Sequence, residues 1–335
     1  MNPELNREYV QSGEDEIFDK MVELTIGQMN TSSDGHRLRV QHAKATGCVT
    51  AKFQVGADIP ADLRHGVFRE PGQTFDAIAR FSNSQGTIEP DGEGTVRGLA
   101  IKLLDVSGAR AIQDDHDRTQ DFLLVDHPVF LFPNPRAYLD IMSRKSVPLI
   151  GKLFAAVHLA IFERDELSIL KAMKSKRVAS PLEITYWSGS PFWLGDAKRL
   201  VGHAVKYSAV PRETRSAPPV DPDKVPSDYL SKAISEHLAD REAFFDFKVQ
   251  TQSHPIRMPV EDVSMEWDED VSKPITLGSL RIGIQKVDPS GDLEKQCESM
   301  SFNPWHALAE HRPMGGINRL RKAVYQASFN HRVGH

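Results

Sequence analysis

Apolar and polar residues alternate along several short stretches of the chain, which is the pattern of β-strands with one buried face. The alternation is clearest over residues 46–55 (TGCVTAKFQV). Turns rich in Gly, Pro and Asp, such as residues 89–94 (EPDGEG), separate these stretches. The predicted strands lie near residues 48–55, 76–82, 95–104, 121–125, 199–209, 243–252 and 277–286.

Helical spacing of apolar residues appears before, between and after the strands. One amphipathic segment places Ile17, Met21 and Leu24 on one side of a helix. Another begins at Pro135, a residue that suits the first position of a helix. The predicted helices cover residues 14–29, 135–175, about 226–240, and a terminal segment that begins near 316. Two strand-rich halves that flank helices predict an α+β barrel.

Length and composition indicate a globular protein. The chain has 335 residues, of which 40% are hydrophobic and 26% are charged, so it has enough apolar material for a substantial core. A net charge of −5 argues against nucleic-acid binding. The first residues (MNPELNRE) show no apolar run behind a basic patch, so we expect no secretory signal and a cytoplasmic location.

The most apolar stretch, residues 149–162, is too short to cross a membrane and carries Lys152 and His158, so it predicts a core helix and no membrane anchor. Cys48 and Cys297 lie far apart in the sequence and belong to no CxxC or Cys/His cluster. They predict neither a zinc site nor a disulfide framework, and we expect them to be small buried hydrophobes.

Arg321 and Tyr325 are the most informative pair of polar residues in the chain. Four residues apart on a helix, they lie on one face. An unperturbed tyrosine titrates near pH ~10, so a neighbouring cation is needed to keep the phenol oxygen ionised for binding ferric iron. Arginine is permanently charged and supplies that cation. Tyrosinate is a known haem ligand, although a solvated helix face often carries such a pair as well.

Five further motifs, separated along the chain, resemble those of the catalase superfamily and occur in the family's order. They are residues 39–44 (RVQHAK), 80–82 (RFS), 95–102 (TVRGLAIK), 126–130 (DHPVF) and 301–304 (SFNP). The resemblance runs from about residue 36 to the C-terminus and is thin between about 145 and 195. It is greatest to the short, single-domain catalase-related haem peroxidases.

This resemblance implies a closed antiparallel barrel of eight strands that binds haem b. We expect one domain over residues 1–335, with a helical arm at 1–30, the barrel at 36–310 and the ligand helix at 315–335. Tyr325 would bind the iron with support from Arg321. Three arginines would bind the haem propionates, namely Arg39, Arg80 and Arg332.

On the peroxide side, the resemblance implies that His42 is the distal acid–base residue, because histidine titrates near neutral pH. Ser82 would fix the orientation of its ring. His127 and Phe130 are further candidates for the pocket wall.

Two positions depart from the family pattern. Asp126 falls where catalases have an asparagine that donates to peroxide, and an ionised carboxylate only accepts hydrogen bonds. If the alignment slips by one residue, Val125 holds that position instead. Gln41 replaces an apolar residue beside the distal histidine, where allene oxide synthases carry a polar threonine. Both departures predict slow disproportionation of hydrogen peroxide.

The favoured function is therefore a haem peroxidase that acts on hydrogen peroxide or organic hydroperoxides, with an unknown reductant and weak catalase activity. A lipid hydroperoxide-transforming enzyme is the first alternative. A haem carrier or sensor without catalysis is the second alternative. The last interpretation is a barrel that binds no haem. A homodimer is expected from the prevalence of two-fold symmetry.

Overall fold

The alternating stretches are antiparallel β-strands in this computed structural model, which describes residues 3–334 except 34, 94, 114–116, 146–175, 177, 197, 200, 215–220 and 222–223. The strands are β1 (Ala45–Val55), β2 (Thr74–Asn83), β3 (Arg97–Leu103), β4 (Gln120–Val125), β5 (Tyr186–Trp187), β6 (Phe192–Asp196), β7 (Val201–Pro211), β8 (Ala243–Thr251) and β9 (Ile275–Ile282). All seven predicted strands are present, and their ends differ from the prediction by a few residues.

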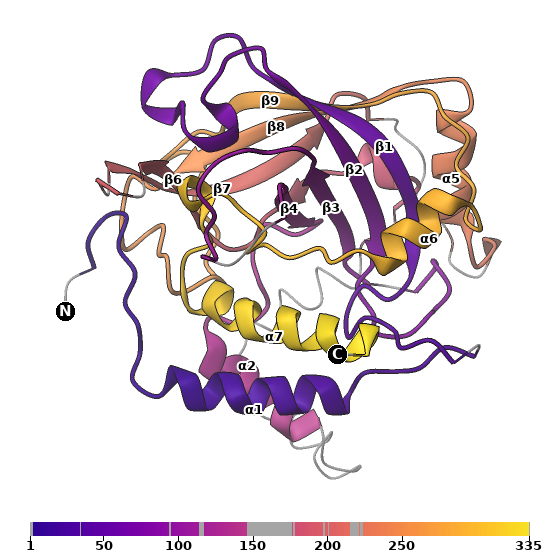
Figure 1. Cartoon of the computed structure of the whole chain (residues 1–335), viewed down its shortest axis with the longest axis horizontal. Helices are drawn as coiled ribbons and strands as arrows, with labels where there is room; N and C mark the ends of the chain where they lie inside the picture. Colours follow the sequence, from indigo (N-terminus) through magenta and orange to yellow (C-terminus); the bar gives the residue numbers. More distant parts are fainter. Residues whose placement is uncertain are drawn as a thin grey trace.

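The sheet closes into a barrel (Figure 1). Its strands are neighbours in the order β5-β4-β3-β2-β1-β9-β8-β7-β6, and β5 also pairs with β7. The ring therefore contains the eight strands β1–β5 and β7–β9, while β6 extends the sheet beside β7. The two-residue strand β5 closes the ring, because it pairs with β4 on one side and β7 on the other. The predicted α+β barrel of eight antiparallel strands is confirmed.

Aromatic side chains fill the barrel interior. Phe53, Phe68, Phe122, Tyr207 and Phe247 are each at most 1% exposed, and their rings pack against one another. Because successive strand residues point to opposite faces, the residues between these inward-facing ones point outward. A cofactor-sized site must therefore lie on the outer face of the barrel.

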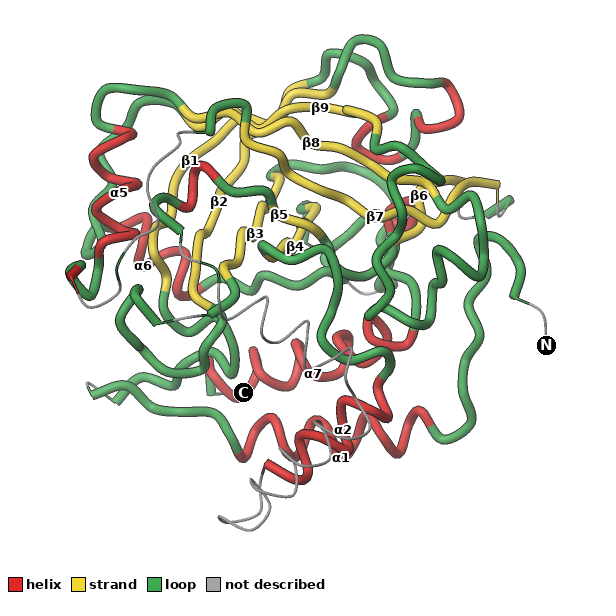
Figure 2. Tube along the Cα trace, turned by 180° about the vertical axis from the view of Figure 1, so that it is seen from behind, coloured by secondary structure: helices red, strands yellow, loops and turns green. Residues whose placement is uncertain are grey.

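Helices cover parts of that outer face. They are α1 (Glu14–Gly27), α2 (Pro135–Lys145), α5 (Tyr229–Leu238), α6 (Asp292–Ser299) and α7 (Gly316–Val333), with short 3₁₀ turns η1 (Ala61–Leu63), η2 (Gly66–Phe68), η3 (Pro181–Glu183) and η5 (Ala309–His311). Helix α7 lies between the barrel and the α1–α2 pair (Figures 1 and 2). Ile17, Met21, Leu139 and Leu320 join these three helices in one apolar cluster.

Helix α6 was not predicted, and it packs on the outside of β1 and β2. Cys48 of β1 and Cys297 of α6 form a disulfide across 249 residues of sequence. Both cysteines are buried as expected, but the prediction that they form no disulfide is wrong. Sequence separation hid the pair, because only the fold brings α6 onto β1.

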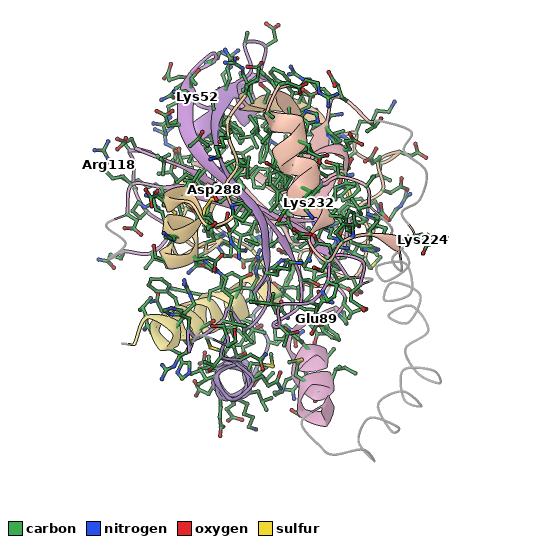
Figure 3. All side chains as sticks on the ribbon, turned by 90° about the vertical axis from the view of Figure 1, so that its right-hand side faces the viewer. Lys52, Glu89, Arg118, Lys224, Lys232 and Asp288 are labelled. Atoms are coloured by element: carbon green, nitrogen blue, oxygen red, sulfur yellow. A yellow bond between two sulfur atoms is a disulfide. The ribbon has the colours of Figure 1, made fainter. Side chains whose placement is uncertain are left out.

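Some predicted elements lie wholly or partly outside the described residues. The apolar stretch 149–162 lies wholly outside them. The predicted helix 135–175 lies outside them beyond residue 145. In the part of the chain that the structure describes, no helix combines the length and apolar character needed to cross a membrane. Figure 3 shows the labelled Arg118 and Lys224 at opposite edges of the side-chain view.

Candidate functional site

His42 lies in the loop that leads into β1, and its backbone has a positive φ of 57°. This left-handed conformation is uncommon for a residue with a side chain and occurs often at functional positions. The His42 Nδ1 atom is 3.0 Å from Ser82 Oγ. Both residues therefore lie where the sequence predicts an oriented distal histidine.

Gly98 leaves the space that the His42 ring occupies. A Cβ atom at Gly98 would lie 2.6 Å from both Cε1 and Nδ1 of His42 and 2.8 Å from Ser82 Oγ. Since carbon atoms normally approach to about 3.5–4.0 Å, no larger residue fits without moving the ring. The absence of a side chain at Gly98 thus determines how close His42 lies to the sheet.

Val125, and not Asp126, stands in the same row of the sheet as Ser82 and Gly98. The strand register pairs Ser82 with Gly98 and Gly98 with Val125. Directly opposite residues project to the same face of a sheet. The geometry therefore agrees with the alternative alignment, in which Val125 lies beside the distal histidine.

Asp126 points instead toward the backbone of β3. Its Oδ1 accepts a hydrogen bond of 2.9 Å from the Arg97 amide, and its buried Oδ2 has no hydrogen-bond partner among the described residues. Lys176 Nζ lies 3.8 Å from Oδ2. Burial raises the pKa of the Asp126 carboxyl, an effect that the charges of Lys176 and Arg97 partly offset.

The three arginines predicted to bind propionates lie together around the end of α6. Arg39 and Arg80 both pair with the Glu298 carboxylate. Arg39 and Arg332 also donate to the carbonyl oxygens of Glu298 and Met300. The sequence prediction that these arginines form one group is consistent with this arrangement.

We call Arg39, Arg80 and Arg332 the arginine cluster. Around it, positive charge exceeds negative charge. Burial and the charge of Arg80 lower the pKa of Arg39 to about 9, despite the opposing effect of Glu298. Burial alone would raise the pKa of Glu298, but Arg80 and Arg39 outweigh it and lower that pKa. The cluster could therefore accept further anionic groups.

Helix α7 carries the Arg321–Tyr325 pair. Arg321 donates a 3.2 Å hydrogen bond to the Tyr325 hydroxyl, and its guanidinium carbon lies 5.2 Å from the centre of the tyrosine ring. Arg321 also donates to Asn318 Oδ1 and Ser190 Oγ at 3.1 and 3.3 Å. The predicted one-face geometry is present.

Electrostatics connect α7 with His42. Burial lowers the pKa of His42 to about 3, with further contributions from the charges of Arg80, Arg321 and Arg39. Arg321 belongs to α7 and Arg80 belongs to β2, so two different elements act on the same imidazole. The His42 ring is consequently neutral at physiological pH.

An aromatic group lies beside this site. Gln41 donates a 3.2 Å hydrogen bond to the Tyr138 hydroxyl, while the Tyr138 ring stacks on Phe132 at 4.7 Å and lies 5.8 Å from Phe130. Burial raises the pKa of Tyr138 to about 12. Gln41 and Phe130 are thus linked through Tyr138. His127 is half-buried, and its Nδ1 atom lies 3.4 Å from the Val129 backbone nitrogen and oxygen.

Comparison of the whole fold with solved structures finds many similar chains, and three catalases are among them. A fungal catalase matches with a TM-score of 0.71 and 15% identity, over 100% of this chain and 66% of the catalase. A bacterial catalase matches with a TM-score of 0.67 and 15% identity, over 99% of this chain and 64% of that one. Catalase A from Saccharomyces cerevisiae matches with a TM-score of 0.71 and 14% identity, over 99% and 68% of the two chains.

The chain has the catalase fold. It spans about two thirds of the length of these catalases. No family model matches the sequence, and no curated protein matches it either. The catalase fold is therefore established by structure, while the roles of individual residues rest on their geometry in this chain.

Four residues of this catalase-fold site were not predicted, namely Glu298, Tyr138, Ser190 and Asn318. Asn318 precedes Arg321 by three residues, which is a spacing that places both on one helix face and could have identified it. The other three carry no local signal, because each reaches the site from an element distant in sequence.

Proposed function

We propose that this chain is a haem-dependent peroxidase that reduces hydrogen peroxide or organic hydroperoxides and has weak catalase activity. The observation that carries the proposal is the presence of two hydrogen-bonded pairs, Arg321–Tyr325 and His42–Ser82. A phenol with an arginine partner suits an iron ligand, and an oriented neutral imidazole suits a proton acceptor.

The residues fit haem b in three respects. Tyr325 offers the type of ligand that catalase uses for its iron, and Arg321 donates a hydrogen bond to the Tyr325 hydroxyl. The arginine cluster holds three guanidinium groups around the Glu298 carboxylate, and guanidinium groups suit the carboxylates of haem propionates. Gly98 keeps the His42 ring against the sheet. Bound haem would supply the redox chemistry at its iron.

His42 would move the proton of the peroxide. If its Nδ1–H donates to Ser82 Oγ, Nε2 carries the free lone pair, and Nε2 has no partner among the described residues. In the proposed reaction, Nε2 takes the proton from the hydroperoxide O–H and returns it to the departing oxygen. Such general acid–base catalysis contributes about 10²–10⁴-fold.

The side chains at positions 125 and 126 support peroxidase activity over rapid disproportionation. Asp126 uses one carboxylate oxygen for the Arg97 amide, and Val125 occupies the row beside His42. Neither side chain offers an amide N–H to a bound peroxide. His42 would therefore work without the amide that the catalase pattern provides at that position.

Transformation of a lipid hydroperoxide is the second candidate. It is favoured by the aromatic group of Phe130, Phe132 and Tyr138, which lies beside Gln41 next to the distal histidine. Aromatic surface suits the chain of a fatty acid better than it suits hydrogen peroxide. A carrier without catalysis needs no oriented acid–base residue, so the His42–Ser82 pair argues against it.

The test is a screen of the haem-loaded protein with hydrogen peroxide, cumene hydroperoxide and a fatty-acid hydroperoxide, each with and without an electron donor. We expect donor oxidation with all three peroxides and at least comparable efficiency for the bulky ones. Donor-independent conversion of the fatty-acid hydroperoxide would favour the second candidate. Rapid oxygen release from hydrogen peroxide alone would contradict the proposal. A cytoplasmic location and a homodimer stay predictions.

A further inference from the structure

The Cys48–Cys297 disulfide lies beside the arginine cluster. Cys48 stands opposite Arg80 in the register of β1 and β2, and directly opposite residues project to the same face of a sheet. Cys297 precedes Glu298, whose carboxylate pairs with Arg39 and Arg80. The carbonyl oxygen of Cys297 also accepts a 2.8 Å hydrogen bond from Arg39. The disulfide therefore joins two residues that both adjoin the arginine cluster.

Helix α6 depends on tertiary contacts for its position. It has eight residues, and isolated helices shorter than about 12–15 residues are marginal in water. Among its residues, all of which the structure describes, only Cys297 is buried. Leu293 is partly buried against the small apolar cluster of Cys48, Ile78 and Cys297. Breaking the disulfide should therefore lower the free energy that local opening of α6 requires.

The Glu298 carboxylate occupies the arginine cluster as an anion of the chain itself. Its Oε1 atom accepts hydrogen bonds of 2.8 and 3.1 Å from Arg80, and its Oε2 atom accepts one from Arg39. The Glu298 side chain is 44% exposed, so it can turn into solvent when α6 opens. A haem propionate is also a carboxylate. Glu298 and a propionate therefore compete for the same two guanidinium groups.

Opening of α6 has two opposing effects on the arginine cluster. It removes the backbone carbonyl oxygens of Cys297, Glu298 and Met300, which orient Arg39 and Arg332. It also removes the competing carboxylate of Glu298. The carboxylate carries a full charge that attracts the guanidinium groups, whereas the carbonyl groups carry no net charge. Loss of the carboxylate decides the sign, so opening of α6 should favour the binding of propionates.

A peroxide and a dithiol reductant can interconvert the two states of the cysteine pair. In the oxidation, the two thiols lose two electrons and two protons to a hydroperoxide, ROOH. The S–S bond forms, and the O–O bond breaks to give ROH and water. In the reduction, the dithiol supplies two electrons and two protons and becomes a disulfide itself. Because both cysteines are buried, the reductant reaches them when α6 opens.

We propose that the Cys48–Cys297 disulfide is a redox lock on haem binding. The oxidised chain holds the Glu298 carboxylate on the arginine cluster, and reduction lets α6 open so that haem propionates take its place. This inference rests on the proposed function, in which the chain binds haem and meets peroxides. A peroxide locks the haem-free chain, and a dithiol reductant unlocks it.

The first experiment measures hydrogen exchange in the haem-free chain before and after reduction with dithiothreitol. The chain has two cysteines, so thiol–disulfide exchange acts at this bond alone. The protected amides of α6 should exchange at least about tenfold faster after reduction. Those of β8, which is two strands away from β1 in the sheet, should change less than about twofold. This measurement involves no haem.

The second experiment titrates haem into the unchanged chain and into Glu298→Gln, each oxidised and reduced, with the reductant removed under anaerobic conditions beforehand. Hydrogen bonds between charged groups are worth about tenfold or more. We therefore expect reduction to tighten haem binding about tenfold in the unchanged chain. In Glu298→Gln, binding should be tight in both redox states and differ less than about twofold, because the competing carboxylate is already gone.

Two control variants accompany the titration. Asp292→Asn makes the same carboxylate-to-amide change at an exposed position of α6, and should keep the tenfold response to reduction. The double variant Cys48→Ala/Cys297→Ala cannot form the disulfide. It should bind haem as the reduced chain does and show no response to dithiothreitol. If this double variant does not fold, the reduced unchanged chain supplies the same comparison.

Equal haem affinity of the oxidised and reduced chains would overturn the inference. An undiminished redox response in Glu298→Gln would also overturn it, because the competition would then not involve that carboxylate. The inference and the proposed function fail separately. Faster exchange of α6 in a chain that binds no haem in either state would refute the function and leave the redox-dependent opening of α6 intact. Haem binding through Tyr325 with an affinity independent of the redox state would refute only the inference.

Discussion

Replacing Gly98 with alanine tests whether the position of the His42 ring controls activity. The added Cβ would lie 2.6 Å from two atoms of the ring. To reach a normal separation of about 3.5 Å, the ring must move by roughly 1 Å. That movement would extend the 3.0 Å contact between His42 and Ser82 beyond hydrogen-bond distance.

The Gly98→Ala substitution should lower the reaction rate much more than the stability. A displacement of about 1 Å in a catalytic group can reduce a rate about 100-fold, whereas overpacking costs about 1–3 kcal/mol of stability. Gly98 does not have a positive φ, so alanine introduces no backbone strain there. We therefore expect a folded Gly98→Ala protein whose peroxide-dependent donor oxidation is about 100-fold slower.

The assay combines the rate of donor oxidation at matched haem content with urea unfolding. Gly283→Ala is the control, because a Cβ there meets no atom within 4 Å and the backbone φ is not positive. It should leave rate and stability nearly unchanged. A folded Gly98→Ala variant whose rate stays within about threefold of the unchanged chain would refute the reasoning.

Three further changes test the other parts of the site. His42→Ala should keep haem and lower the rate of peroxide consumption at least ~100-fold; a loss of only a few-fold would identify another residue as the base. Glu298→Gln removes the carboxylate shared by Arg39 and Arg80, so titration should show tighter haem binding and unfolding should show a less stable haem-free protein; weaker haem binding would count against the propionate assignment. Burial raises the pKa of Asp126, so its contribution to stability is present below the ordinary value of 3.8 and is lost as pH rises through the folded pKa. Asp126→Asn should abolish that decline in urea-unfolding measurements across the acid-to-neutral range, and an unchanged pH profile would show that the carboxyl does not titrate as inferred.

The barrel was predictable because its long strands alternate clearly. Strands β1 and β8 follow the two-residue period over most of their length, with inward apolar positions and outward polar ones. Strand β5 has only two residues, too few for any period to appear, although it closes the ring. Helix α6 is largely polar, and its packing depends on the buried Cys297.

Motifs in the sequence predict which residues form the candidate site, as at His42, Ser82 and Tyr325. Its electrostatics were not predictable, because they depend on distant partners. Glu298 meets Arg39 and Arg80 only when α6 packs on the barrel. The direction of the Asp126 carboxylate depends on the strand register, which no local pattern records.

The central claim is that Tyr325 binds haem iron, and a titration of the purified haem-free protein with haem tests it most directly. We expect saturable binding at one haem per chain and a ferric spectrum typical of tyrosinate ligation. In Tyr325→Phe, that spectrum should be lost and the affinity reduced. Equal affinity and an unchanged ferric spectrum in Tyr325→Phe would contradict the account.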